Sequence, residues 1–313
     1  MIRYYTVSEN KIKKIDEIED SEGILWIHLT NPDQENIDYI VNRYQIPKDY
    51  ITSALDEDEV ARTEHIRTKL KHKLLTFTYP KKIEKDKFIT RLLSITLLEN
   101  IIITTSLDQP SIIEPITENK FTYIKNLDTT MDLVIEMIWL ITHEFLAYIH
   151  EIKQMQESIG SNLLRSTDSN TLIKQSNLIK STIYFDYGLR GNKRVLEIIR
   201  KQVSEDIPVK FEAIKDIDIE NEQALVRNKQ QQEIIESIGD INSSIISNNL
   251  NIVAKIMTSL TILMTIPTII SGIWGMNVEL PFLNHEYSFG IIMAITFILM
   301  FICYRALKRH DFL

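Results

Sequence analysis

The chain has 313 residues with a formal net charge of −8, and 25% of the residues are charged and 44% apolar. This length is enough for one large domain or two ordinary ones, and the composition excludes a disordered or collagen-like chain. The acidic balance argues against nucleic acid as a partner, and the single cysteine, Cys303, excludes a disulfide framework and a cysteine-rich zinc site.

The first 125 residues are predicted to form a cytosolic α/β domain. Strand-length runs rich in Ile, Leu, Tyr and Thr lie at 2–7, 24–29, 73–79, 89–98 and 101–106. Between them, Asn31 and Pro32 suit the start of a helix that continues to about Arg43. Because strand and helix signals alternate, we expect a layered α/β architecture.

Long helices are predicted after residue 125. Segments 128–160 and 171–203 have helical character, with expected interruptions at 161–170 and 188–191. No proline lies between Pro208 and Pro267, so a single helix can run from about 207 to 273, a length of about 100 Å. We therefore predict a helical stalk over residues 126–250 that continues into the membrane.

The last part of the chain, 251–313, is predicted to be a membrane domain. Residues 256–278 and 287–304 carry no charge, which indicates two transmembrane helices at about 252–275 and 287–305. The loop between them holds two acids and no Lys or Arg, whereas Lys255 and Arg305 flank the apolar runs. The positive-inside rule then puts both termini in the cytoplasm and the protein in the cell membrane.

A polar stripe follows the predicted stalk helix into the membrane. Its members are separated alternately by three and four residues, which places them on one helix face: Ser244, Ser247, Asn251, Ala254, Thr258, Thr261, Thr265 and Thr268. Polar side chains in lipid turn toward a water-filled path or toward a neighbouring helix, and either is compatible with the stripe. Two spans cannot enclose a path alone, so a path requires several copies of the chain.

The first span ends with Gly275, Met276 and Asn277. One interpretation is a helix C-cap with Gly275 at positive φ. The other is a resemblance to the CorA family of divalent-cation (magnesium) transporters, whose hallmark is Gly-Met-Asn at the end of the first of two carboxyl-terminal membrane helices. Trp26-Ile27-His28-Leu29, followed by Pro32, also resembles the amino-terminal pattern of that family.

The resemblance implies a homopentameric funnel in which the first spans line the pore and the second spans form an outer ring. Gly275, Met276 and Asn277 would then form the selectivity filter, and Asp240 would be a pore-facing acid of the funnel. Met257 matches a position of the hydrophobic constriction, whereas Thr265 stands where the family usually has a bulky Met. The pore-lining positions of the family include five stripe members: Ser247, Asn251, Ala254, Thr265 and Thr268.

The residue chemistry suits magnesium as the transported ion, and the resemblance implies that magnesium can also act as a regulatory ion of the transporter. Neutral amide oxygens, such as those of Asn277, can hydrogen-bond to a hydrated Mg²⁺ without stripping its water. Glu279 and Glu286 would attract cations at the mouth, or are two solvated loop acids. Asp216 aligns with a stalk acid that helps the family to bind a regulatory cation between subunits. We expect no cofactor.

Other functions stay open at this point. The chain lacks a phosphate-binding loop for a nucleotide, so influx would be driven by the membrane potential, and no enzyme site is predicted. Zinc, cobalt or nickel could replace magnesium, and a membrane-anchored scaffold or sensor without permeation is a third hypothesis. The acidic run Asp56–Glu59 is interpreted as a helix start or an exposed acidic patch. A second cluster is interpreted as a solvated acidic face that could also form a surface metal site: His143, Glu144, His150 and Glu151.

Overall fold

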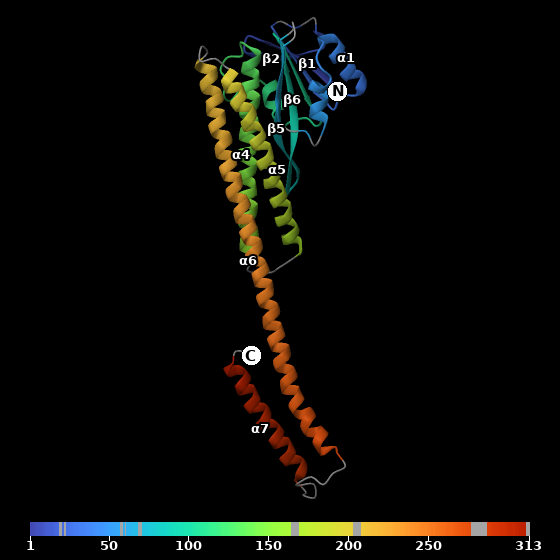
Figure 1. Ribbon diagram of the computed structural model, residues 1–313, viewed down its shortest axis with the longest axis vertical. Helices are drawn as coiled ribbons and strands as arrows, with labels where there is room; N and C mark the ends of the chain where they lie inside the picture. The colour runs from blue at the N-terminus through green and yellow to red at the C-terminus, as the bar shows by residue number, and fades with distance from the viewer. Residues whose placement is uncertain are drawn as a thin grey trace. The chain divides into compact units, whose positions relative to one another are not determined.

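The computed structural model describes residues 1–18, 21, 23–56, 59, 61–67, 71–163, 169–202, 208–276 and 287–310. The chain divides into two compact units, Met1–Gly239 and Asp240–Leu313. The first unit contains a β-sheet, helices α1–α5 and the first part of α6, and the second contains the rest of α6 together with α7 (Figure 1).

The described part of the first unit has a seven-stranded sheet in the order β2-β1-β3-β7-β6-β5-β4. Its strands are β1 (Ile2–Ser8), β2 (Lys11–Ile15), β3 (Ile24–Thr30), β4 (Thr63–Arg67), β5 (Lys71–Glu84), β6 (Lys87–Leu97) and β7 (Ile101–Ser106). Neighbouring strands are antiparallel except β3 and β7, which run parallel with Trp26 opposite Ile102. The five predicted strands are confirmed. β2 and β4 were not predicted, and both lie at the edges of the sheet.

Both faces of the sheet are covered, and the alternating side chains of the inner strand β3 contribute to the core on each face. Leu25, Ile27 and Leu29 point to one face and join a core with α1 (Gln34–Tyr44), whose N-cap is Asp33. Trp26 points to the other face, where the larger core includes α4 (Thr130–Leu163) and α5 (Ser169–Gln202). Figure 1 shows α4, α5 and the start of α6 side by side along the sheet. The short helices α2 (Asp49–Thr52), η2 (Ser53–Leu55) and α3 (Ile113–Thr117) lie in the connections.

The long helices agree with the predictions in number and extent, but one expected interruption is wrong. Helix α5 continues through Gly188 and Gly191 without a break. A Cβ added at Gly188 would lie 2.9 Å from Thr78 Cγ2, and one at Gly191 would lie 3.0 Å from Ala61 Cβ. These glycines therefore permit close packing of α5 on its neighbours and do not end the helix.

Helix α6 (Pro208–Trp274) is one continuous helix of 67 residues with Pro267 inside it. Its first part is held against α5 by side-chain amides that donate to backbone carbonyls: Asn221 to Leu189 at 3.1 Å, Asn228 to Thr182 at 2.8 Å, and Gln175 to Ile235 at 2.8 Å. The partners recur every seven residues on both antiparallel helices. This spacing fixes one register between α5 and α6.

Three described helices are long and apolar enough to cross a membrane: 130–159, 209–274 and 288–309. In α4, 56% of the most apolar window is buried within the protein, whereas the share is 11% in α6 and 6% in α7 (Ser288–Arg309). Leu133, Ile138 and Phe145 of α4 belong to the core that covers the sheet. The apolar character of α4 thus serves the core, and α6 and α7 remain as the membrane spans.

Candidate functional site

The polar stripe lies on an exposed face of α6. All eight of its members are exposed in the single chain. The other exposed faces of this segment carry large apolar side chains, such as Ile256, Met257 and Leu260. An exposed polar stripe on an otherwise apolar membrane helix indicates that the stripe faces water or other polar groups and not lipid.

The hydroxyl groups of the stripe are oriented by the helix itself. Thr265 Oγ1 donates to the Thr261 carbonyl at 2.8 Å, and Thr261 and Thr268 donate in the same way to the carbonyls four residues earlier, at 2.8 and 2.9 Å. Because the proton of each hydroxyl is used within the helix, the oxygen is left to accept hydrogen bonds from outside. The stripe therefore presents acceptor oxygens, which suit the water molecules around a hydrated cation.

The stripe does not face α7. The least exposed residues in the same stretch of α6 lie on a different face, which includes Ser259, Leu263 and Ile270. Leu263 shares an apolar groove with Phe297 and Phe301 of α7, so this second face is the one that α7 covers. At 3.6 residues per turn, the mean directions of the two faces differ by roughly 140°. Packing of α6 against its own α7 therefore leaves the stripe available.

The end of α6 differs from a glycine C-cap at positive φ. Gly23 has a positive φ of 104°, whereas the φ of Gly275 is not positive. The Gly275 amide donates to the Ser271 carbonyl at 2.9 Å, and a Cβ at Gly275 would lie 3.1 Å from that oxygen. The interpretation of Gly275 as a C-cap with positive φ is therefore wrong. Glycine suits this position because a Cβ would come close to the Ser271 carbonyl oxygen. Met276 is 58% exposed, and Asn277, Glu279 and Glu286 lie outside the described residues.

Three further predicted positions lie on α6. Met257 is 60% exposed, and Asp240 is exposed, with its backbone carbonyl accepting from Ser244 Oγ at 2.9 Å. Asp216 accepts a hydrogen bond from the Tyr123 hydroxyl at 2.8 Å. Burial, together with this bond to Asp216, raises the pKa of Tyr123 to about 12, so the phenol stays protonated and donates.

The alternative interpretation of the acidic cluster on α4, a surface metal site, finds no support in the described residues. His143 Nδ1 lies 3.1 Å from the Trp139 carbonyl, and its ring packs on the Trp139 ring with centroids 4.0 Å apart. Glu144 accepts from Ser111, and Glu151 pairs with Lys82. Within the described residues, no group of three or more His, Cys, Asp or Glu side chains could hold a metal ion.

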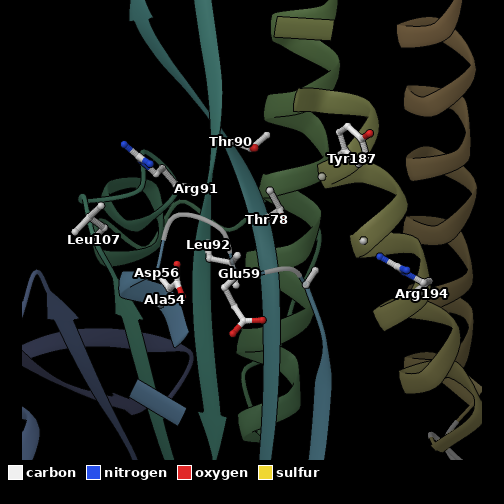
Figure 2. A pocket seen from close by; sticks show the side chains of 13 residues that line it. Ala54, Asp56, Glu59, Thr78, Thr90, Arg91, Leu92, Leu107, Tyr187 and Arg194 are labelled. Atoms are coloured by element: carbon white, nitrogen blue, oxygen red, sulfur yellow. The ribbon is translucent and has the colours of Figure 1, made fainter. Parts of the chain in front are cut away.

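One pocket of the first unit was not predicted (Figure 2). It has a volume of about 240 Å³, and Figure 2 shows Tyr187 and Arg194 on α5 on one side of it and Asp56 and Glu59 on the other. Glu59 forms an ion pair with Arg62 at 3.1 Å. Asp56 is the C-cap of η2 and has an extended backbone, and Glu57 and Asp58 lie outside the described residues. Since the pocket holds charges of both signs, it gives no preference for a cation.

Comparison with known proteins places these features in one family. The sequence-family model that describes the CorA-like Mg²⁺ transporter proteins matches residues 21–309 of this chain. The cobalt/magnesium transport protein CorA of Methanocaldococcus jannaschii is 23% identical over 311 residues, which cover 96% of this chain and 95% of that protein. The complete structure of the CorA magnesium transporter from the same organism matches with a TM-score of 0.84, over 99% of this chain and 98% of that one. The full-length CmaX protein matches with a TM-score of 0.75 at 12% identity, over 98% and 97% of the two chains.

The fold, the two membrane helices and these matches define a membrane transport protein for divalent cations and not an enzyme. The chain belongs to the family of CorA-like Mg²⁺ transporter proteins. The expected fold class, an amino-terminal α/β domain followed by a long helix that continues into the first of two carboxyl-terminal membrane helices, is confirmed.

Proposed function

We propose that this protein is a magnesium channel in the cell membrane, built as a homopentamer in which the polar stripes of α6 face a common axis. Both termini and the amino-terminal domain lie in the cytoplasm in this proposal. Residues 126–250 act as the stalk and 251–313 as the membrane domain. Gly275, Met276 and Asn277 form the filter at the outer mouth, where Glu279 and Glu286 attract cations.

The observation that carries the proposal is the orientation of the stripe. Its side chains lie on a face of α6 that α7 does not cover, and the hydroxyls of Thr261, Thr265 and Thr268 leave their oxygens free to accept. A single chain would expose this polar face to lipid, which is unfavourable. Several copies around one axis would enclose it as a wet path. Ser247, Asn251 and Ala254 continue the path toward the cytoplasm, with Asp240 beyond them.

Magnesium fits the donor groups of this path. Mg²⁺ keeps its octahedral water shell, and hydroxyl and amide oxygens can accept hydrogen bonds from that shell without binding the ion too tightly to release it. A divalent ion gains roughly 4.6 kcal/mol in crossing 100 mV, so an inside-negative potential is sufficient to drive influx. Thr265 leaves the path wider than a Met would, and Met257 is then the main apolar constriction.

Cobalt is the second candidate ion, because the relative from Methanocaldococcus jannaschii is named a cobalt/magnesium transport protein. Zinc and nickel remain alternatives within the same mechanism. For regulation, we propose that cytosolic magnesium binds at Asp216 between neighbouring subunits. Its carboxylate already accepts from the Tyr123 hydroxyl, so Tyr123 would orient one carboxylate oxygen and leave the other for the ion.

The test is divalent-ion uptake into proteoliposomes that contain a magnesium-sensitive dye, under an inside-negative potential. Wild type is compared with Asn277→Ala, and cobalt, nickel and zinc serve as competitors. We expect magnesium entry in the wild type and its loss in the variant. Asn170→Ala, a change at the start of α5 far along the chain from the filter, is the control and should conduct normally.

Each other outcome has a defined meaning. Entry of zinc or cobalt without magnesium would keep the channel and change its ion. No entry of any ion, in a preparation of correct oligomeric mass, would favour the scaffold or sensor hypothesis. A monomer or dimer in detergent would contradict the pore, since two or four spans cannot enclose it.

A further inference from the structure

A second feature of the membrane unit lies outside the proposed path: an apolar groove between α6 and α7. The groove has a volume of about 570 Å³, and its lining is apolar apart from one phenol. Its lining residues are Leu263, Phe297, Ile298, Met300, Phe301 and Tyr304. Phe297, Ile298 and Phe301 are each about 60% exposed, so the groove is open on the outside of the helix pair. In a membrane, lipid chains have access to such a surface.

The basic end of α7 continues the same face of the helix. Phe297, Phe301, Tyr304 and Lys308 follow at spacings of four, three and four residues, so Lys308 extends the line of groove residues. Arg305 lies seven residues after Ile298 and therefore above it. The Arg305 guanidinium lies 5.8 Å from the centre of the Phe301 ring, which ties the basic end to the apolar groove.

The dimensions match one lipid molecule. From Phe297 to Tyr304 the helix rises by about 10 Å, and Lys308 lies about 6 Å further along. Half the thickness of a hydrocarbon core is about 15 Å. An acyl chain can thus lie along Phe297, Ile298 and Phe301 while the headgroup reaches the basic residues, and the Tyr304 hydroxyl lies between them, at the depth where aromatic residues meet the interface.

We infer that this groove is a binding site for an anionic phospholipid, with its phosphate at Arg305 and Lys308 and an acyl chain against Ile298 and Phe301. The apolar lining alone would accept any lipid chain, but the two cations on the same face favour a negative headgroup. The leaflet follows from the topology in the proposed function, which puts the end of α7 at the cytoplasmic surface. The lipid would brace α7 against α6 on the side away from the polar stripe.

The test measures lipids that stay bound to the full-length protein in detergent, by native mass spectrometry, with phosphatidylglycerol and phosphatidylcholine of identical acyl chains. Two cations near the membrane surface should favour the anionic lipid by roughly thirtyfold in occupancy. Arg305→Gln with Lys308→Gln should remove this preference. Lys13→Gln with Lys14→Gln removes the same charge from two exposed positions of β2, far along the chain from the groove, and should preserve it. Equal retention of both lipids by the wild type would overturn the proposal.

Two isoleucines of α7 provide a matched pair of positions for testing whether lipid binds in the groove. Ile298 lines the groove and is 59% exposed, and Ile302 is 58% exposed and is not part of the lining. Ile298→Trp, which fills the groove, should lower the occupancy of both lipids several-fold, and Ile302→Trp should not. Ile298→Ala and Ile302→Ala repeat the comparison without added bulk. Equal effects at the two positions would overturn the site.

A third result concerns the occupant. If a second copy of the chain covers the groove, Ile298→Trp will lower the oligomeric mass and leave the lipid count unchanged, which would also overturn the proposal. Lipid occupancy is measured without ion transport, so a failure of the proposed channel function would not mimic any of these outcomes.

Discussion

The side chain of Asn192 pairs with both backbone groups of Thr78: the Thr78 amide donates to Asn192 Oδ1 at 2.8 Å, and Asn192 Nδ2 donates to the Thr78 carbonyl at 2.7 Å. The ladder between β4 and β5 ends nearby, at the pair Thr63 and Leu75. The Asn192 amide thus takes the place of the missing strand and fixes α5 to the edge of β5. Both residues are buried, so no water replaces these bonds.

Replacement of Asn192 by Leu should lower the free energy of unfolding by about 2–6 kcal/mol, because a buried amide and a buried carbonyl lose their partners at about 1–3 kcal/mol each. Thermal and denaturant unfolding of the full-length protein in detergent, followed by circular dichroism, measures the change. Asn177→Leu is the control on the same helix, since Asn177 makes one long bond to Asp86 at 3.3 Å. Similar losses in both variants would contradict the role of the Asn192 pair.

The same strand limits the size of the residue at position 188. A Cβ at Gly188 would lie 2.9 Å from Thr78 Cγ2, 3.2 Å from Thr90 Cγ2 and 3.3 Å from Phe145 Cζ. Gly188→Ala should therefore destabilise the protein by about 1–3 kcal/mol through overpacking, although alanine favours the helix. Gly290→Ala on α7 meets no atom within 4 Å and should be neutral or stabilising. A gain in melting temperature for Gly188→Ala would contradict the close packing.

The elements that could be predicted from the sequence are those in which hydropathy and spacing agree. The two membrane helices, the continuous helix α6 and the stripe from Ser244 to Thr268 follow from apolar runs and from spacings of three and four. The strands β2 and β4 could not be predicted, since each is five residues long and rich in charged side chains that suit a sheet edge. Gly188 was expected to interrupt a helix because its packing partners on β5 and β6 are far away in the sequence.

The site was predictable only in part. Periodicity identified the stripe, but the orientation of the Thr hydroxyls depends on backbone geometry that sequence spacing does not contain. The groove between α6 and α7 requires the pairing of two helices, and its lining residues look like ordinary lipid-facing side chains in the sequence. The long helix α4 passed the same hydropathy test as the membrane spans, and only its burial against the sheet separates it from them.

Acid should weaken the amino-terminal domain through His28. This residue is fully buried in β3, where Nδ1 lies 2.8 Å from Thr104 Oγ1 and Nε2 lies 3.1 Å from Thr30 Oγ1. Burial, with a smaller contribution from the charge of Arg3, lowers the pKa of His28 from 6.5 to about 4. The imidazole therefore binds a proton below about pH 6.5 in the unfolded chain but only below about pH 4 in the folded chain. The contribution of His28 to the free energy of unfolding is thus complete above about pH 6.5 and decreases as the pH falls from 6.5 to 4.

Between pH 7 and pH 4.5 the contribution of His28 to the free energy of unfolding should fall by roughly 2 kcal/mol. His28→Gln keeps a polar side chain without a titrating ring, so the difference between its stabilities at the two pH values should be smaller than in the wild type by that amount. Denaturant unfolding at both pH values measures it. His150→Gln on α4 is the control and should keep the wild-type difference. An unchanged pH dependence in His28→Gln would contradict the assignment.

The role of the stripe oxygens can be separated from the packing of the helix at Thr265. Thr265→Val keeps the shape of the side chain and removes the hydroxyl, which otherwise presents an acceptor oxygen on the exposed face of α6. We expect magnesium uptake in proteoliposomes to fall several-fold, because in the proposed homopentameric pore a ring of methyl groups would replace a ring of acceptors and a hydrated cation would lose partners there. Thr296→Val on α7 is the matched control: its hydroxyl also donates to the carbonyl four residues earlier at 2.8 Å, but it lies on the buried side of that helix. Uptake should be unchanged in Thr296→Val. An equal loss in the two variants, or none in Thr265→Val, would mean that the stripe serves helix packing, and the conduction path would then have to lie along another face of α6.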